Sequence, residues 1–160
     1  MSVSLTDEDI SRLLAEAKSL PPDWRNRLEM KSRSGHGEQQ MEFLGADGSC
    51  FRVILRQSEH NSLDFSAILA YCAPESNAVV RLCRCNGKSH EHTNRIEGDR
   101  FYAFHVHKAT QRYQELGGKE DSHAEACDAY VDLRGALMHL CVICGIDVPQ
   151  EPQMSLLEVD

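Results

Sequence analysis

Short segments of alternating apolar and polar residues dominate the first half of this chain, and they limit its fold more than any other feature. In the third of them, Phe51, Val53 and Leu55 share one face while Arg52 and Arg56 share the other. Alternation with a period of two, interrupted by turns, predicts antiparallel strands with one buried face. The segments lie near residues 25–33, 38–44, 50–57, 63–72 and 78–85.

A helix is predicted on each side of this sheet-forming region. Residues 5–20 begin with Thr6 as an N-cap and carry an apolar stripe. Residues 122–144 show apolar side chains at three- and four-residue spacing and end before Gly145, a typical C-terminal cap. The expected fold class is therefore α+β, with a mostly antiparallel five- or six-stranded sheet packed by an N-terminal and a long C-terminal helix.

The length of 160 residues favours one domain, which we place at residues 1–146. Residues 147–160 are acidic and interrupted by proline, so a loosely held tail is expected there. No apolar run approaches the roughly 20 residues that a membrane helix needs, and the first residues lack the pattern of a secretory signal. The odd number of cysteines, seven, favours free thiols in a reducing compartment. These features predict a cytoplasmic protein without a membrane partner; the oligomeric state is left open.

The residues best suited to chemistry are four histidines in two His-x-His pairs, His90/His92 and His105/His107. The first pair lies in a predicted loop, residues 86–99, and the second in a predicted strand. Residues two apart in a strand point the same way, about 7 Å apart, so His105 and His107 can reach one ligand. Histidine is the side chain that titrates near neutrality, and we predict catalytic acid and base roles for all four.

The histidines lie in a basic segment of an acidic chain. Residues 81–112 hold seven basic and three acidic side chains, although the whole chain has a net charge of −8. This local charge favours an anionic ligand over a broad polyanion-binding face. The residues that we expect to bind the anion are Arg84, Lys88, Arg112, Asn86 and Asn94.

Two metal sites are weaker alternatives, and we assign no metal ligand and no cofactor from the sequence. Zinc could bind the four histidines, or three of them plus water, but their spacing matches no strong zinc signature. Cys83, Cys85, Cys141 and Cys144 could form a four-thiolate zinc site, although packing of all four as core thiols explains them as well.

The histidine segment resembles an uncharacterised family of bacterial single-domain proteins, a domain of unknown function. The shared runs are N-G-x-S-H-x-H-T-N, I-E-G and F-x-x-F-H-x-H-x-A-T-x-R-Y, at residues 86–94, 96–98 and 101–113. The resemblance extends over most of residues 5–145 and implies a fold, but no activity. A weaker likeness in layout is to small bacterial toxins encoded beside an antitoxin, in which an arginine-bearing strand precedes a histidine-rich strand.

Two hypotheses about function follow. The first is a small hydrolase, a toxin-like ribonuclease or phosphodiesterase, in which the histidines act on RNA or a small anionic ligand. The second is a non-catalytic binding or interaction module with a protein partner or a metal bound by the same histidines. Joint action requires the two histidine pairs to lie on one face and within about 10 Å of each other.

Overall fold

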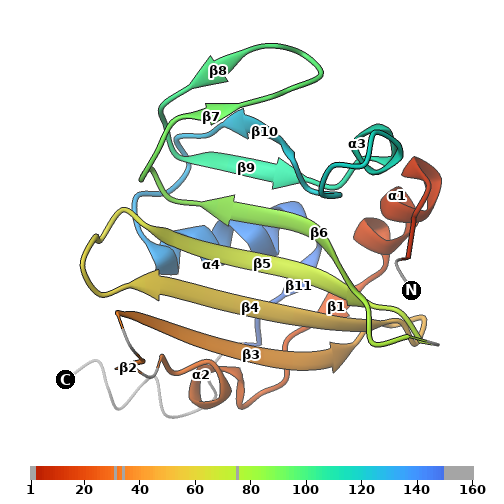
Figure 1. The fold of residues 1–160 in the computed structure, drawn as a ribbon. Helices are drawn as coiled ribbons and strands as arrows, with labels where there is room; N and C mark the ends of the chain where they lie inside the picture. Colours follow the sequence, from red (N-terminus) through yellow and green to blue (C-terminus); the bar gives the residue numbers. More distant parts are fainter. Residues whose placement is uncertain (1–2, 31, 34, 75, 150–160) are drawn as a thin grey trace.

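A seven-stranded antiparallel sheet forms the centre of the computed structural model, which describes residues 3–30, 32–33, 35–74 and 76–149 (Figure 1). Its strands are β2 (Ser32–Arg33), β3 (His36–Leu44), β4 (Cys50–Ser58), β5 (Phe65–Cys72), β6 (Val79–Asn86), β9 (His105–Lys108) and β10 (His123–Ala126). From one edge of the sheet to the other, the strand order is β10-β9-β6-β5-β4-β3-β2. The predicted α+β class with an antiparallel sheet is confirmed.

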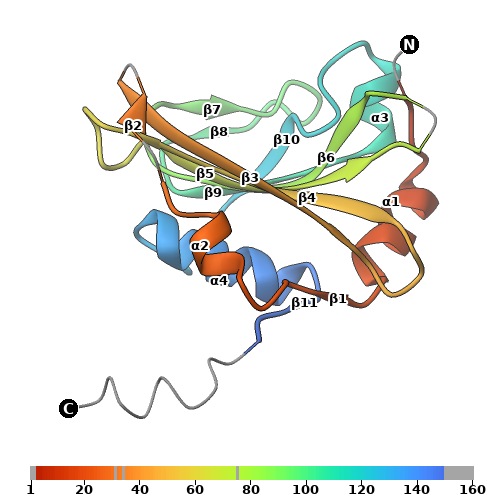
Figure 2. The ribbon, with the colours of Figure 1, turned by 90° about the horizontal axis from the view of Figure 1, so that it is seen from below.

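The alternation in β4 produces the buried face as predicted. Phe51, Val53 and Leu55 are buried, and Arg52 and Arg56 point to the other side, where they pair with Glu42 and Asp64. Helix α4 (Leu133–Ile143) packs against β4, β5 and β6 and covers the buried face, beside the short helix α2 (Trp24–Arg27) (Figure 2). No helix among the described residues has both the length and the hydropathy to cross a membrane.

Helix α1 (Asp7–Ala15) begins as predicted. The Thr6 hydroxyl accepts a hydrogen bond from the Asp9 amide at 3.0 Å, and the Asp9 carboxylate accepts one from the Thr6 amide at 3.2 Å. The helix ends earlier than the predicted residue 20, because Lys18–Ser19 form strand β1, which pairs in parallel with β11 (Ile146–Asp147). Its side chains Ile10 and Leu13 are buried in the core.

The predicted C-terminal helix is too long at its N-terminal end. Residues 123–126 form β10 because their backbone pairs with β9, and the helix begins only after Asp132, whose side chain accepts a hydrogen bond from the Gly135 amide at 2.8 Å. The predicted strand at residues 25–33 is correct only at its end, where Ser32–Arg33 form β2, since α2 occupies residues 24–27. The other four predicted strands match β3 to β6 with ends that differ by at most two residues. Residues 150–160 of the predicted tail lie outside the described residues.

The predicted loop at residues 86–99 contains half of a small hairpin. Strand β7 (His92–Thr93) pairs with β8 (Arg100–Phe101), and this hairpin lies on the face of the sheet opposite α4 (Figure 2). Helix α3 (Gln111–Glu115) follows β9. The hairpin therefore packs over β9 and β10 at one edge of the sheet (Figure 1), and its side chains contact those of β9.

Candidate functional site

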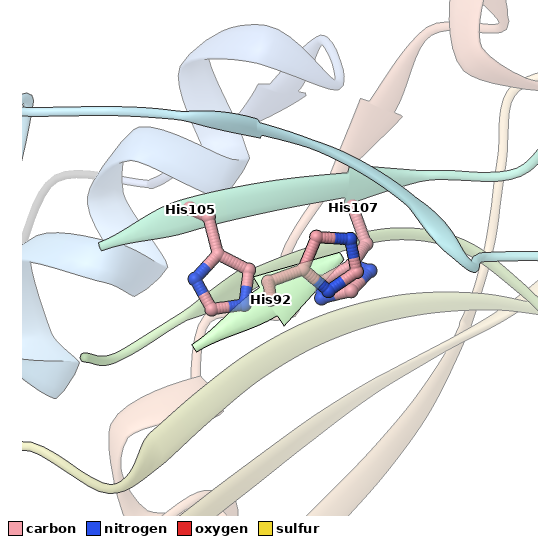
Figure 3. Close-up of side chains that lie close together, drawn as sticks. All are labelled: His92, His105 and His107. Atoms are coloured by element: carbon pink, nitrogen blue, oxygen red, sulfur yellow. The ribbon is translucent and has the colours of Figure 1, made fainter. Parts of the chain in front are cut away.

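Three histidine side chains converge between the sheet and the β7–β8 hairpin (Figure 3). One ring nitrogen from each of His92, His105 and His107 lies within 4.8 Å of the others. The ring centroid of His92 lies 5.3 Å from that of His105 and 4.9 Å from that of His107. The centroids of His105 and His107 are 4.9 Å apart. The two histidine pairs thus meet on one face, as joint action requires.

The strand pairing explains why His105 and His107 point toward the hairpin. In β9, Val106 joins the hydrophobic core, so its two neighbours project from the opposite face of the sheet. Both side chains are nonetheless buried, with 1% and 5% of their surface exposed. They are therefore not residues of a solvated sheet face, since the hairpin covers them and contributes His92.

Hydrogen bonds to backbone carbonyls fix the proton positions on two of the rings. Nδ1 of His105 lies 2.8 Å from the Ala103 carbonyl oxygen, and Nδ1 of His107 lies 2.7 Å from that of Asp121. Because a carbonyl oxygen can only accept, Nδ1 carries the hydrogen in both rings and Nε2 keeps its lone pair. Nε2 of His105 is buried and has no hydrogen-bond partner among the described residues.

Asn94 fixes the third ring. Its side-chain amide donates to the Ala124 carbonyl at 2.8 Å, and its Oδ1 accepts from the Ala124 amide at 2.9 Å. Oδ1 also lies 2.8 Å from Nε2 of His92, so that nitrogen donates and Nδ1 of His92 keeps the lone pair. Asn94 is 1% exposed and also bonded to Asp99, so it supports His92 from a buried position.

Burial keeps the central rings uncharged. Desolvation, with the positive charge of Arg84 and the neighbouring histidines, lowers the pKa of His105 to about 4 and that of His107 to about 2. Both rings are therefore neutral at pH 7. Neutral imidazole is the form that binds a metal ion.

A buried carboxylate links the cluster to two arginines. The Asp121 carboxylate is completely buried and lies 3.0 Å from Nε of Arg84 and 3.4 Å from a terminal nitrogen of Arg81. Arg81 also forms an ion pair with Glu120 at 3.7 Å, so the two arginines face two carboxylates. Arg84 lies opposite His107 in the β6–β9 pairing, so its ion pair with Asp121 adjoins the histidines.

A pocket of about 780 Å³ opens beside the cluster, and His92 and His107 form part of its wall. Its volume falls in the range of pockets that hold small-molecule ligands. The other residues that line it come from β6, from residues 90–96, and from α3 and the segment that follows it. They are Arg84, Asn86, His90, Thr93, Arg95, Ile96, Tyr113, Leu116, Gly117, Gly118, Lys119, Asp121 and Ser122.

The predicted site residues divide between the pocket and its surroundings. Arg84, Asn86 and His90 line the pocket, and the His90 ring lies 6.2 Å from that of His105. The other two predicted anion-binding cations contact neighbours instead. Lys88 Nζ lies 5.1 Å from the centre of the Tyr102 ring, and Arg112 forms an ion pair with Glu97.

The sequence contains no signal for several residues of this site. Asp121 lies outside every motif, and its contacts with Arg84 and His107 depend on pairing between strands. Lys119 lies on the loop between α3 and β10. Arg95 contributes to the predicted basic segment, but nothing in the sequence places it in the pocket wall.

No protein-family model matches the chain. No curated protein and no solved structure is significantly similar to it either. The resemblance to the uncharacterised bacterial family therefore stays a prediction.

The cysteines give no comparable site. All seven are free thiols, and Cys83, Cys85, Cys141 and Cys144 are buried. Among the described residues, the only other group of three potential metal ligands is Glu42, Cys50 and Cys72, in which Glu42 is exposed and bonded to Arg52. The histidine cluster is the better supported centre because it is buried and its rings are held by hydrogen bonds.

Proposed function

We propose that this protein is a metal-dependent hydrolase in which His92, His105 and His107 bind one divalent metal ion. The observation that carries the proposal is the convergence of three imidazoles, each held by a hydrogen bond through one of its ring nitrogens. Metal-binding histidines almost always donate their second N–H to a carbonyl or carboxylate group, which orients the ring. The buried Nε2 of His105, with no partner among the described residues, fits a ligand atom.

Zinc is the metal that this ligand set favours. Three neutral imidazoles bind zinc with nitrogen–metal distances of about 2.0–2.1 Å, and a water molecule completes the tetrahedron in catalytic sites. Nitrogens within 4.8 Å of one another need only small side-chain shifts to reach that geometry. Oxygen-preferring ions such as Mg²⁺ and Ca²⁺ fit less well, since no carboxylate belongs to the group.

Hydrolysis is the chemistry that an open three-histidine site supports. The fourth coordination position would face the pocket, because His92 and His107 contribute to its wall. A water molecule on such a zinc ion has a pKa of about 7 and supplies hydroxide near neutral pH. His90, which is exposed on the pocket wall, is available to exchange protons with that water or with a leaving group.

Metal-independent acid–base catalysis by the same histidines is less well supported. A general acid must hold a proton at the working pH, whereas burial keeps His105 and His107 neutral at pH 7. A non-catalytic metal-binding module shares the metal site but lacks turnover. Metal analysis and activity measurements together distinguish the three functions.

The test begins with the metal content of the purified chain after incubation with zinc and removal of the excess. We expect about one zinc ion per chain in the native protein and in His60→Ala, a control at an exposed histidine. His92→Ala, His105→Ala and His107→Ala should each lose it, and thermal melts of the metal-free proteins should show that they are folded.

Activity is then measured on an activated phosphodiester and on RNA, with and without EDTA. Turnover that EDTA abolishes and zinc restores supports the hydrolase. Zinc binding without turnover on any substrate favours the binding module, and turnover that EDTA leaves unchanged favours acid–base catalysis. Failure of the native protein to bind any divalent metal would overturn the proposal.

A further inference from the structure

The pocket beside the histidines has its own chemical character, which points to a substrate class. We propose that Arg84 binds a phosphate group of the substrate, so that the phosphate oxygens lie between the guanidinium and the metal centre. This inference rests on the proposed function for the metal, but it concerns a different side chain and a separate binding event.

Arg84 lies in the same part of the pocket wall as His107. Arg84 is paired with His107 in the β6–β9 register, and both side chains line the pocket. The Arg84 side chain is 22% exposed, so it is largely enclosed but still open to a ligand. A phosphate on the metal would therefore meet the guanidinium of the adjacent strand.

Asp121 orients Arg84 for this contact by pairing with one edge of its guanidinium. Its carboxylate lies beside Nε of Arg84, which leaves the two terminal nitrogens on the other edge of the guanidinium. The same carboxylate also contacts Arg81, which has Glu120 as a second partner. Two terminal N–H groups of an arginine match two oxygens of a phosphate in a bidentate arrangement.

Asp121 also joins Arg84 to the metal centre. Its backbone carbonyl accepts the hydrogen bond from Nδ1 of His107, at 2.7 Å. One residue thus positions a metal ligand through its backbone and the arginine through its side chain. Such double anchoring fixes the relative position of the two groups that would hold the phosphate.

The rest of the pocket wall suits a phosphate ester. Arg95 and Lys119 add two positive charges, and Asp121, which is paired, is the only carboxylate among the described residues that line the wall. Asn86 accepts a hydrogen bond from the Ser66 hydroxyl through Oδ1 at 2.7 Å, so its amide N–H groups are directed elsewhere. Three apolar or aromatic side chains, Ile96, Tyr113 and Leu116, give an organic group a surface to pack against.

Phosphate is favoured over carboxylate because the site offers contacts from two directions. A tetrahedral phosphate can place one oxygen on a metal ion and two others on an arginine, whereas a carboxylate has only two oxygens. The volume of about 780 Å³ is larger than inorganic phosphate requires. We therefore expect a phosphate ester of nucleotide size.

The experiment is calorimetric titration of the zinc-loaded protein with inorganic phosphate, a 5′-mononucleotide and a short single-stranded RNA. Arg84→Lys keeps the charge and removes the planar fork, and Arg84→Gln removes both. Arg100→Gln is the control, because it makes the same charge change on the nearby β8 strand at a residue outside the pocket wall. Zinc content and thermal melts are measured for every variant.

We expect Arg84→Lys to weaken phosphate binding by about tenfold and Arg84→Gln by more, with zinc content unchanged and the control unaffected. Asp121→Asn, which keeps the backbone carbonyl, should retain zinc and weaken phosphate binding. Equal phosphate affinity of the native protein and folded Arg84→Lys and Arg84→Gln would overturn the inference and leave the metal centre intact. If the native protein bound no zinc, the proposed function would be overturned, even if phosphate binding still depended on Arg84.

The three ligands distinguish the sources of the phosphate. Tighter binding of the mononucleotide than of inorganic phosphate supports an ester of nucleotide size. Tighter binding of RNA than of the mononucleotide extends the ligand to a polynucleotide. Binding of inorganic phosphate alone would contradict the ester and keep only the phosphate subsite.

Discussion

His107 donates a hydrogen bond from Nδ1 to the backbone carbonyl of Asp121 at 2.7 Å, across the pairing of β9 with the segment that leads into β10. This contact fixes the tautomer of a buried ring that lies against His92 and His105. The same principle holds for all three rings, since each is oriented by a carbonyl or amide oxygen.

Removal of the Asn94 side chain should weaken the proposed centre without touching a ligand. Asn94→Ala removes the bonds to His92, Asp99 and the Ala124 backbone. We expect the zinc affinity to fall by about 10- to 100-fold and the free energy of unfolding to fall by about 2–3 kcal/mol. Competition with a chromophoric chelator and urea unfolding measure the two effects. Unchanged zinc affinity in a folded variant would show that Asn94 does not orient His92.

Stability should fall as the pH drops below neutrality. Folding lowers the pKa of His105 to about 4 and that of His107 to about 2, compared with about 6.5 in the unfolded chain. The unfolded state therefore binds more protons than the folded state below about pH 6.5. Each of the two histidines should lower the free energy of unfolding by about 2 kcal/mol between pH 7 and pH 5. Urea unfolding of the metal-free protein at several pH values measures this loss.

The pH prediction has a direct control. His105→Gln should reduce the pH dependence, because one of the two buried imidazoles is gone, whereas the exposed His60→Ala should leave it unchanged. A free energy of unfolding that is equal at pH 7 and pH 5 in the native protein would contradict the buried neutral state of these rings.

Gly87 is required by a close backbone contact at the start of the histidine segment. A Cβ at this position would lie 1.9 Å from the carbonyl oxygen of Leu63. Gly87→Ala should therefore displace the connection from β6 to His90 and His92, at a cost of about 3 kcal/mol or more. Gly48→Ala is the matched control: it has a positive φ but open space around it, so it should cost only about 1 kcal/mol. Denaturant unfolding compares the two, and equal losses would contradict the steric explanation.

Tyr130 joins the two strands beneath the site. Its hydroxyl lies 2.7 Å from the Asn86 carbonyl and 3.0 Å from the His105 carbonyl. Tyr130→Phe should lower the free energy of unfolding by about 1–2 kcal/mol, since the buried carbonyls lose their donor. Tyr102→Phe, at an exposed ring, should change it by less than about 0.5 kcal/mol. Thermal melts test both, and an unchanged Tyr130→Phe protein would show that these contacts are dispensable.

Much of the sheet could be predicted from residue order. Alternation in β4 is a local property, because neighbouring residues of a strand must point to opposite faces whatever the partner strand is. For the same reason His105 and His107 share a face. The capping box of Thr6 and Asp9 is equally local, since it closes within four residues of α1.

Residues 122–132 show where local patterns fail. Their spacing fits a helix, yet residues 123–126 pair with β9, and the free backbone groups of that edge strand outweigh the helical pattern. Secondary structure at a sheet edge depends on the partner strand. The partner of His123 is Lys108, which lies 15 residues earlier in the chain, and the other pairs of β9 and β10 are farther apart. No periodicity within the segment contains that information.

The candidate site, too, depends partly on local sequence and partly on contacts between distant segments. The two His-x-His pairs and the basic segment are visible in the chain, but the selection of His92 over His90, the support from Asn94 and the contacts of Asp121 are not. These depend on burial and on hydrogen bonds between distant segments, because a ring's proton position and charge follow from the groups around it. Residue order thus locates the histidines and their shared strand face, while the packing of the β7–β8 hairpin on the sheet creates the buried, neutral and convergent cluster.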